Sequence, residues 1–382
     1  MPTPDFRTIR QWFLKLGLFE LKQPKEPRSD WIFILDTTFG HSHKKCFLIL
    51  GIPYQQWLQK RNSGMTEIEY HDLQVLSLNV LESTKGSILA SILNDLTSIV
   101  GQPLQIISDH GADLIRGIKL HRQQHPEIIF TYDFTHQVAL WFKAKAEQDV
   151  RFTNFLAICS SIRSQINSTN LSFLMAPLAK SLARYHNVDI FIHWAANIFQ
   201  YWDKQDFSLI DANPSFGKKK FLSYFHPLLH YRPELNTYRG VLSVYSSAKQ
   251  LLAQNGLHHK SVSDWLELSQ KFADSPQIQS SIQQVTQYLT TQTQHIPQSL
   301  VLPSRSDIIE SLFGKYKQFR DSSSFSEINE MILSFCLFTS KLTAKDILAA
   351  LENVTINDLN SWIQQTFGQS FLSKRRQAFS IT

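Results

Sequence analysis

Three acidic residues stand where the chain could bind a divalent cation. Asp36 lies in the apolar stretch WIFILDTTF, Asp109 in QIISDHG, and Glu310 in SRSDIIESLFGKYK. Burying a lone carboxylate costs several kcal/mol unless the group is paired or holds a metal. Carboxylates without a His or Cys cluster favour Mg²⁺, with Mn²⁺ as the alternative. Two such ions can activate a water or hydroxyl and stabilise the leaving oxygen of a phosphodiester, so the pattern predicts phosphodiester chemistry.

Each of these acids also has a structural interpretation. Asp109 directly precedes an expected helix, where an aspartate often serves as the N-cap. Glu310 stands three residues after Asp307, which is the spacing of a capping box. Asp36 has no helix after it, so its alternative to a functional role is a satisfied structural carboxylate.

The residues around the acids predict a mixed α/β sheet. Amphipathic patterns predict helices at 85–100 and 112–125, and strand-forming runs cover residues 31–39, 44–52, 71–83, 103–111 and 127–134. Three sequential strands can meander antiparallel, and each later αβ unit adds a parallel strand by a right-handed crossover. The ends of the first and fourth strands then lie side by side, which would bring Asp36 and Asp109 together. This order is the topology of the ribonuclease H-like fold.

The rest of the chain reads as helical. A helix over residues 5–20, which Gly17 ends, precedes a Pro- and charge-rich connector. Helical patterns rich in Phe, Trp, Tyr and Gln run from about residue 135 to about 295, and a segment with two prolines (294–307) leads to a helix at 308–320. The expected domains are an N-terminal helix and linker, the first part of the catalytic domain, an α-helical insertion, and the last catalytic helix with a helical C-terminal segment: 1–30, 31–144, 145–302 and 303–382.

The three acidic motifs together resemble those of the DDE-type transposases of bacterial insertion sequences. The resemblance covers most of residues 31–142 and 303–320, in the LDTT, SDHGADLIRGIK and DIIESLFGKYK segments. It implies a ribonuclease H-like catalytic domain, interrupted by a large α-helical insertion, in which Asp36, Asp109 and Glu310 bind two Mg²⁺ ions. A lysine placed as Lys317 is, seven residues after the glutamate, recurs in the last motif of this family. The arginine often found four residues before the glutamate is absent, because Ser306 occupies that place and Arg305 stands one residue away.

Two further features are similar to the same family. Asp133 and His136 in TYDFTHQVA form a D-x-x-H arrangement, for which the resemblance implies structural support of the site. From the residues alone, Asp133 is an N-cap and His136 a nearby hydrogen-bonding group. Trp194 and Trp202 lie eight residues apart on one helical face of the insertion, which is typical of core packing. The alternative is that Trp194 or Trp202 stacks on an extruded base of the DNA.

The charge balance favours a polyanionic partner. The formal net charge is +6 and the pI about 9.0, and basic residues cluster at 218–220, 315–320 and 374–376. The resemblance implies DNA as the partner, both transposon ends and target, bound by a homo-oligomer, most simply a dimer. Lys315, Lys317 and Arg305 are the expected phosphate contacts, with Trp194 as a base contact.

The ends of the chain bear on location and on further partners. No apolar run approaches the length of a membrane span, and the N-terminus has no signal core, so we expect a cytoplasmic, nucleoid-associated protein without a membrane partner. The segment TIRQWFLKLGLFEL resembles the last helix of a helix-turn-helix, so an upstream-encoded DNA-binding segment is a candidate partner. Cys46, Cys159 and Cys336 are far apart and odd in number, which indicates free buried thiols.

The predicted function is therefore metal-dependent DNA cleavage and strand transfer at transposon ends. Three alternatives remain. The first is an inactive or domesticated relative that binds DNA without cutting it. The second is another ribonuclease H-like nuclease, such as a junction resolvase, and the third is a non-enzymatic helical scaffold.

Overall fold

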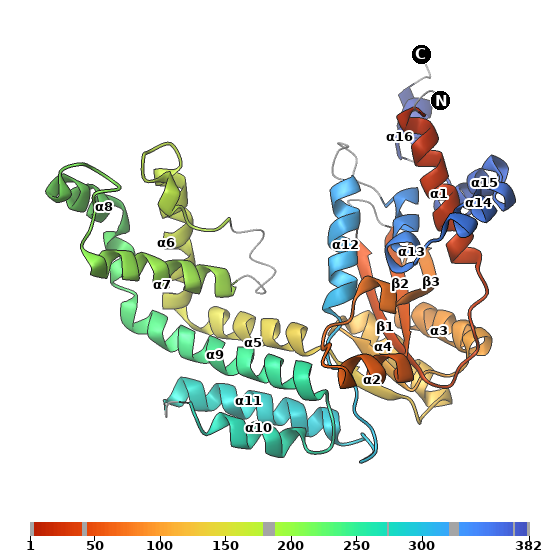
Figure 1. The fold of residues 1–382 in the computed structure, drawn as a ribbon, viewed down its shortest axis with the longest axis horizontal. Coiled ribbons are helices and arrows are strands. Elements are labelled where there is room, and N and C mark those ends of the chain that lie inside the picture. The colour runs from red at the N-terminus through yellow and green to blue at the C-terminus, as the bar shows by residue number, and fades with distance from the viewer. Residues whose placement is uncertain are drawn as a thin grey trace. The chain divides into compact units, whose positions relative to one another are not determined.

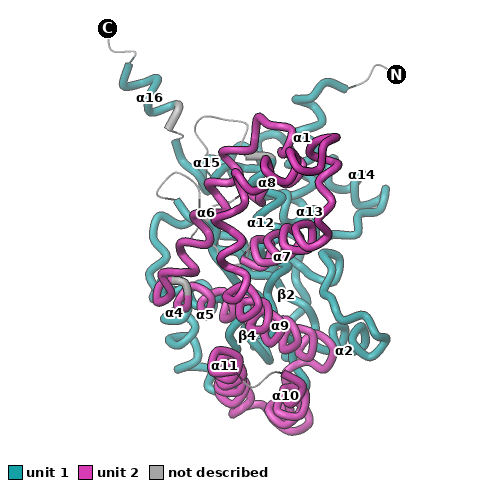
Figure 2. The backbone as a smooth tube through the Cα atoms, turned by 90° about the vertical axis from the view of Figure 1, so that its left-hand side faces the viewer, with its two compact units in different colours: residues 1–133, 301–382 teal, residues 134–300 magenta. Residues whose placement is uncertain are grey.

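A computed structural model describes residues 4–39, 44–178, 188–272, 275–320, 328–369 and 371–379. The chain divides into two compact units (Figures 1 and 2). Unit 1 combines residues 1–133 with 301–382, and unit 2 comprises residues 134–300. Two stretches that are distant in the sequence thus build one unit.

Unit 1 contains a mixed five-stranded sheet. Its strands are β1 (Trp31–Phe39), β2 (Lys45–Pro53), β3 (Gln74–Leu81), β4 (Gln105–Ser108) and β5 (Ile129–Tyr132). The order is β3-β2-β1-β4-β5, in which β1 pairs antiparallel with β2 and parallel with β4. β3 pairs antiparallel with β2, and β5 pairs parallel with β4. The mixed α/β sheet and the neighbouring first and fourth strands predicted from the sequence are confirmed.

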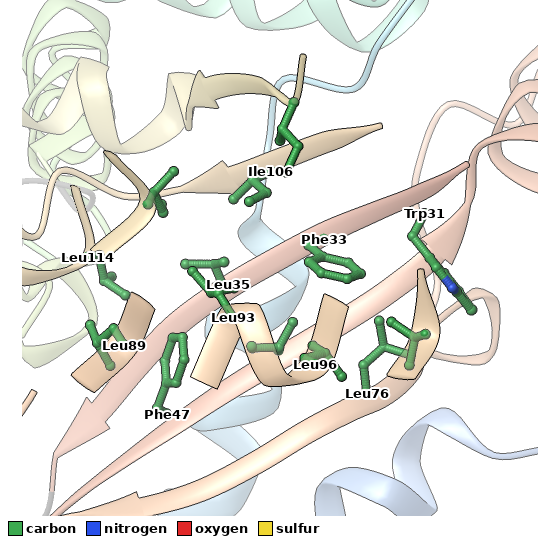
Figure 3. Close-up of a cluster of buried hydrophobic side chains, with 14 residues drawn as sticks. Trp31, Phe33, Leu35, Phe47, Leu76, Leu89, Leu93, Leu96, Ile106 and Leu114 are labelled. Atoms are coloured by element: carbon green, nitrogen blue, oxygen red, sulfur yellow. The ribbon is translucent and has the colours of Figure 1, made fainter. Parts of the chain in front are cut away.

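One face of the sheet carries the apolar core shown in Figure 3. Phe33, Leu35, Phe47 and Ile106 alternate along their strands and pack against two helices, α3 (Gly86–Val100) and α4 (Ala112–Gln124). Side chains alternate across a strand, so the residues between them must point to the other face.

The opposite face is equally buried but is covered by other helices. Ile34, Leu48 and Ile107 have no exposed surface and alternate with the residues of the first face. The helix α12 (Asp307–Arg320) packs against β1, and α13 (Ser334–Thr339) packs against β3. Because α12 belongs to the C-terminal stretch, the chain returns to this sheet only after unit 2.

Helix α1 (Phe6–Lys22) is longer than the sequence predicted, because it does not end at Gly17. A Cβ at Gly17 would lie 2.6 Å from the carbonyl oxygen of Leu333. The glycine therefore allows a close helix crossing in mid-helix. Leu14 and Leu18 join Leu333 in a small core, and α1 packs on α13, α14 (Ala344–Asn353), α15 (Ile356–Phe367) and β3.

Further short helices belong to unit 1. One that the sequence did not predict is α2 (Tyr54–Asn62), which follows β2 directly and buries Tyr54 and Trp57. A single 3₁₀ turn, η1 (Tyr70–Asp72), precedes β3, and α16 (Phe371–Phe379) carries the basic residues 374–376.

A buried histidine links α3 to α4. His121 has no exposed surface; its Nδ1 lies 2.5 Å from Asn94 Oδ1 and its Nε2 3.4 Å from Thr97 Oγ1. Burial first, and then the neighbouring His125, lower the pKa of His121 from 6.5 to about 4. The imidazole is consequently neutral in the folded protein at neutral pH.

This neutral histidine makes stability depend on pH. In the unfolded chain His121 binds a proton below about pH 6.5, whereas in the folded chain it does so only below about pH 4. The stability of the fold is therefore fully present above pH 6.5 and decreases as the pH falls through this interval. We expect the free energy of unfolding to fall by roughly 2 kcal/mol between about pH 7 and pH 5 from this group alone. Urea unfolding of His121→Gln should show a shallower pH dependence, whereas His193→Gln, at an exposed site, should keep that of the wild type. Equal slopes for His121→Gln and the wild type would contradict this assignment.

Unit 2 is built from helices, as the sequence predicted for this part of the chain. They are α5 (Phe134–Gln148), α6 (Val150–Ile166), α7 (Val188–Lys204), α8 (Pro214–Leu229), α9 (Arg232–Asn255), α10 (Ser261–Ser269) and α11 (Pro276–Thr293). Aromatic rings fill its interior; Trp141, for example, stacks on Tyr245 with centroids 5.3 Å apart. The ring centroids of Phe134 and Tyr288 lie 5.1 Å apart, and this contact joins α5 to α11.

The three cysteines are free and buried, as predicted. Burial raises the pKa of each thiol, so none is a reactive thiolate. Within the described residues, the helices are all too short or too polar to cross a lipid bilayer.

Candidate functional site

The candidate site lies on the sheet where β4 ends beside its parallel neighbour β1, which continues to Phe39. Leu35 of β1 is in register with Ser108, the last residue of β4, so Asp36 and Asp109 follow paired residues of two neighbouring strands. Asp36 alternates in phase with Ile32 and Ile34, which places it on the face that α12 covers and not on the α3–α4 face. The juxtaposition of the first two acids that the sequence predicted is therefore present in the backbone.

Both aspartates are half-buried and hold nearby backbone groups. The Thr37 amide donates to Asp36 Oδ1 at 2.6 Å, and the Gly111 amide donates to Asp109 Oδ1 at 2.8 Å. Gly111, not Asp109, is the N-cap of α4, so Asp109 closes the turn before the helix without capping it. Each carboxylate thus has one oxygen held by a nearby backbone amide.

Glu310 lies in the first turn of α12, whose first helical residue is Asp307. Ser306 is therefore the residue directly before the helix. The capping-box interpretation had assigned this position to Asp307. The buried stripe of α12 consists of Ile309, Leu312, Phe313 and Tyr316. Glu310 flanks this stripe on the side of Ser306, since residues four apart lie above one another on a helix.

Two sets of buried hydrogen bonds fix the segment that leads into α12. The Asp133 carboxylate, fully buried after β5, accepts hydrogen bonds from the Ser306 amide and from the Ser306 hydroxyl, the latter at 2.5 Å. Gln105 Nε2 donates to the Pro303 carbonyl at 2.9 Å and to Thr131 Oγ1 at 2.7 Å. We call Gln105, Thr131, Asp133 and Ser306 the α12 anchor. It ties the start of the Glu310 helix to β4 and β5, on the same face as Asp36.

Sequence reasoning identified only part of this anchor. Asp133 is expected from the sequence to support the site, and it accepts hydrogen bonds from Ser306, directly before the helix that carries Glu310. Ser306 was noticed only as a departure from a family motif, and Gln105 and Thr131 were not singled out at all. His136 lies in α5 of unit 2 and is half-buried; its supporting role stays a prediction.

A series of hydrogen-bonded polar side chains lies at the same sheet edge, on the face that α3 and α4 cover. Lys45 Nζ donates to Thr84 Oγ1 at 3.1 Å, and the Thr84 hydroxyl donates to Asp113 Oδ2 at 3.0 Å. His110, beside Asp109, stacks on Tyr132 with centroids 4.2 Å apart. Burial raises the pKa of the Tyr132 phenol, so this hydroxyl stays neutral. This edge of the sheet therefore carries the ammonium group of Lys45 as well as the carboxylates of Asp36 and Asp109.

The basic residues expected to contact DNA have defined surroundings. Lys315 Nζ lies 3.9 Å from the ring centroid of Tyr70 and 5.0 Å from that of Phe338, a cation–π arrangement. Arg305 Nε lies 3.8 Å from Asp307 Oδ2, and Lys317 is half-buried on α12. Contact of these three residues with phosphates stays a prediction.

The two tryptophans of α7 pack inside unit 2. Trp194 Nε1 donates to the Leu174 carbonyl at 3.0 Å. Trp202 stacks on Phe221, with centroids 5.7 Å apart and planes at 18°. These contacts favour the packing interpretation of both residues.

Removing the Trp202 ring should therefore lower stability. We expect Trp202→Ala to reduce the free energy of unfolding by about 3 kcal/mol, the lower end of the range for aromatic truncations, because the ring is only partly buried. Trp12→Ala, at an exposed position of α1, is the matched control and should melt like the wild type. Unchanged melting of Trp202→Ala with impaired DNA processing would favour base stacking instead.

Among the described side chains, no group of three or more His, Cys, Asp and Glu residues is arranged to hold a metal ion. The structure thus brings Asp36 and Asp109 to one sheet edge and Glu310 onto the helix over the same face, but it does not close the three carboxylates into a ready-made metal site.

Comparisons with known proteins add little to this geometry. No protein-family model matches the chain, and no curated protein matches its sequence. Among solved structures the chain is similar to a "Drosophila P element transposase strand transfer complex", with a TM-score of 0.38 and 12% identity over 90% of this chain and 87% of that chain. A similarity at this level says nothing about shared activity.

Proposed function

We propose that this chain is a DDE-type transposase, as found in bacterial insertion sequences, and that it cleaves DNA and transfers strands at transposon ends. In this proposal unit 1 is a ribonuclease H-like catalytic domain. Unit 2 is an α-helical insertion between its fifth strand and its last catalytic helix. Asp36, Asp109 and Glu310 are the catalytic carboxylates.

One observation carries the proposal. Asp36 and Asp109 follow paired residues of adjacent parallel strands, and Asp36 points to the face on which α12 packs. Two half-buried carboxylates at one strand-end edge repel each other unless a cation lies between them. A purely structural role would not require two acids at this place.

The donor set suits a hard divalent cation. Asp36 and Asp109 offer carboxylate oxygens from neighbouring strands, and oxygen is the ligand atom that Mg²⁺ and Mn²⁺ prefer. When bound there, two Mg²⁺ ions would neutralise phosphate charge and lower the pKa of a bound water. Glu310 would complete the set from α12, whose start the α12 anchor holds to β4 and β5.

The remaining proposed roles concern the DNA. Lys315, Lys317 and Arg305 would bind phosphates without reading bases. The partners would be transposon ends and target DNA, held by a homodimer on the DNA. An upstream-encoded segment would contribute end recognition, and Asp133 with His136 would support the site.

A second candidate function is DNA binding without cleavage, as in an inactive or domesticated relative. The absence of a closed three-carboxylate group among the described residues favours this alternative. The presence of acids at all three motif positions favours the enzyme, because a protein that only binds DNA has no use for like charges at the sheet edge.

Metal dependence separates the two. We expect the full chain to nick or cut DNA fragments that carry the sequences flanking its own gene when Mg²⁺ or Mn²⁺ is present, and to lose this activity in EDTA because the carboxylates then lack their counter-ion. The products would be followed on denaturing gels, and DNA binding by fluorescence anisotropy. Binding of these fragments without cleavage in either metal would support the non-cutting relative.

A further inference from the structure

A polar cavity of about 370 Å³ lies in unit 1, away from the candidate catalytic site. Residues at the start of β3 and after the end of α1 line it, together with residues of α2, α13 and α14. Gln74, at the start of β3, is in register with Gly51 near the end of β2. Because β2 runs antiparallel to β1, this is the sheet edge opposite to the one that carries Asp36 and Asp109.

The three carboxylates in the wall of the cavity already have partners inside the protein. Glu20 Oε2 accepts the Ser340 hydroxyl at 2.7 Å. Asp72 Oδ2 lies 2.5 Å from Lys60 Nζ. Asp346 Oδ2 accepts the Thr343 amide at 2.9 Å, as part of the cap of α14. The acids are therefore poorly placed to attract a cationic ligand.

The positive charges of the two lysines in the wall, Lys25 and Lys341, are not paired with a carboxylate of any described residue. Lys25 Nζ donates to the Glu20 carbonyl at 3.0 Å. In the part of the chain that the structure describes, neither Lys25 nor Lys341 has a carboxylate at ion-pair distance. Burial lowers the pKa of Lys25, more than its neighbours Cys336 and Glu20 raise it. Burial thus disfavours the charged form of the Lys25 ammonium group.

Further polar side chains line the same space. The imidazole of His71 and the amides of Gln23 and Gln74 line the cavity with the two lysines. The volume lies within the range of small-ligand sites, toward its lower end. A phosphate group, with several acceptor oxygens and a negative charge, matches such a donor-rich wall better than a single carboxylate does.

We propose that this cavity binds a small phosphate-bearing anion, with Lys25 as the central cation and the exposed Lys341 as a second contact. The phosphate belongs to a free small molecule or to a 5′-phosphorylated DNA end, since both present the same dianionic group. The site does not depend on the proposed transposase activity, because none of its residues takes part in that proposal.

Isothermal titration of the full chain with inorganic phosphate tests the site, in buffer without DNA or divalent metal and at constant ionic strength. We expect saturable binding of one phosphate per chain. Lys25→Met should weaken binding at least about tenfold, while Lys345→Met, at an exposed lysine of α14 outside the cavity, should bind like the wild type. Lys25→Met should not lower the melting temperature, because methionine removes a partly desolvated charge. If it does, Lys341→Met gives the same test at an exposed position, with a severalfold loss expected.

A second titration identifies the source of the phosphate. A short oligonucleotide with and without a 5′-phosphate is compared with a small phosphate monoester in the wild type and in Lys25→Met. A Lys25-dependent preference for the phosphorylated oligonucleotide assigns the site to a DNA end, and a Lys25-dependent preference for the monoester assigns it to a small molecule. Failure of phosphate to saturate by about 10 mM, or equal binding by the wild type and both cavity variants, would overturn the proposal.

Discussion

Asp36→Asn is expected to abolish metal-dependent DNA cleavage while leaving DNA affinity close to that of the wild type. An amide keeps the size of the side chain but is a poor ligand for a hard cation. Loss of an outer-shell partner of a metal already costs about 10–100-fold in activity, so loss of a direct ligand should cost more than about 100-fold. Single-turnover cleavage of end-containing DNA would measure the loss, and anisotropy would measure binding.

The matched control is Asp95→Asn on α3. Asp95 is exposed and far in sequence from the site, so this change removes the same charge without touching the sheet edge. The control should cleave like the wild type. If Asp36→Asn cleaves as fast as Asp95→Asn, Asp36 is not a metal ligand and the proposed mechanism is lost.

The double variant Gln105→Leu with Ser306→Ala should also slow cleavage, by about 100-fold, because a displacement near 1 Å of a catalytic group can have that cost. It removes the side-chain hydrogen bonds of Gln105 and Ser306 in the α12 anchor and leaves the bond from the Ser306 amide to Asp133. It also leaves the Pro303 carbonyl and the Asp133 carboxylate short of buried donors, which should lower the free energy of unfolding by about 1–3 kcal/mol at each site. Because DNA contacts are untouched, kcat should fall while KM for DNA stays nearly constant.

Ser334→Ala is the control for this pair. Ser334 is fully buried in unit 1, and its hydroxyl has no hydrogen-bond partner among the described residues. Its removal should change neither stability nor cleavage appreciably. A mere folding defect in the double variant would lower cleavage only in proportion to the unfolded fraction, so activity that returns fully on cooling below the melting transition would rule out a positioning role.

The sheet and its first two acids could be predicted because the information is local. Each strand has its own apolar run, and the connections determine which strands become neighbours. Asp36 and Asp109 could thus be paired from the sequence before any contact was known. The length of α1 could not be predicted, because the glycine inside it, Gly17, is explained by its contact with Leu333, more than three hundred residues away.

Most of the α12 anchor could not be predicted from the sequence, for the same reason. Gln105 and Pro303 are separated by 198 positions, and Asp133 and Ser306 by 173. Neither pair forms a spacing pattern. From the sequence alone, Gln105 is only an unusual polar residue in a buried strand, and Ser306 is an ordinary N-cap candidate before a helix. Only the packed structure shows that both hold the same segment.

The division of unit 1 into two distant stretches has a consequence for synthesis on the ribosome. The strands that carry Ile34 and Leu48 emerge early, but α12 and α13, which pack on β1 and β3 over this face, belong to residues 301–382. At about 5–20 residues per second, making the intervening unit takes on the order of ten seconds or more. Throughout that interval the nascent sheet exposes an apolar surface that no later strand can cover. We therefore expect nascent chains that stop before α12 to depend on chaperones, and a truncated chain ending at residue 300 to accumulate as aggregates.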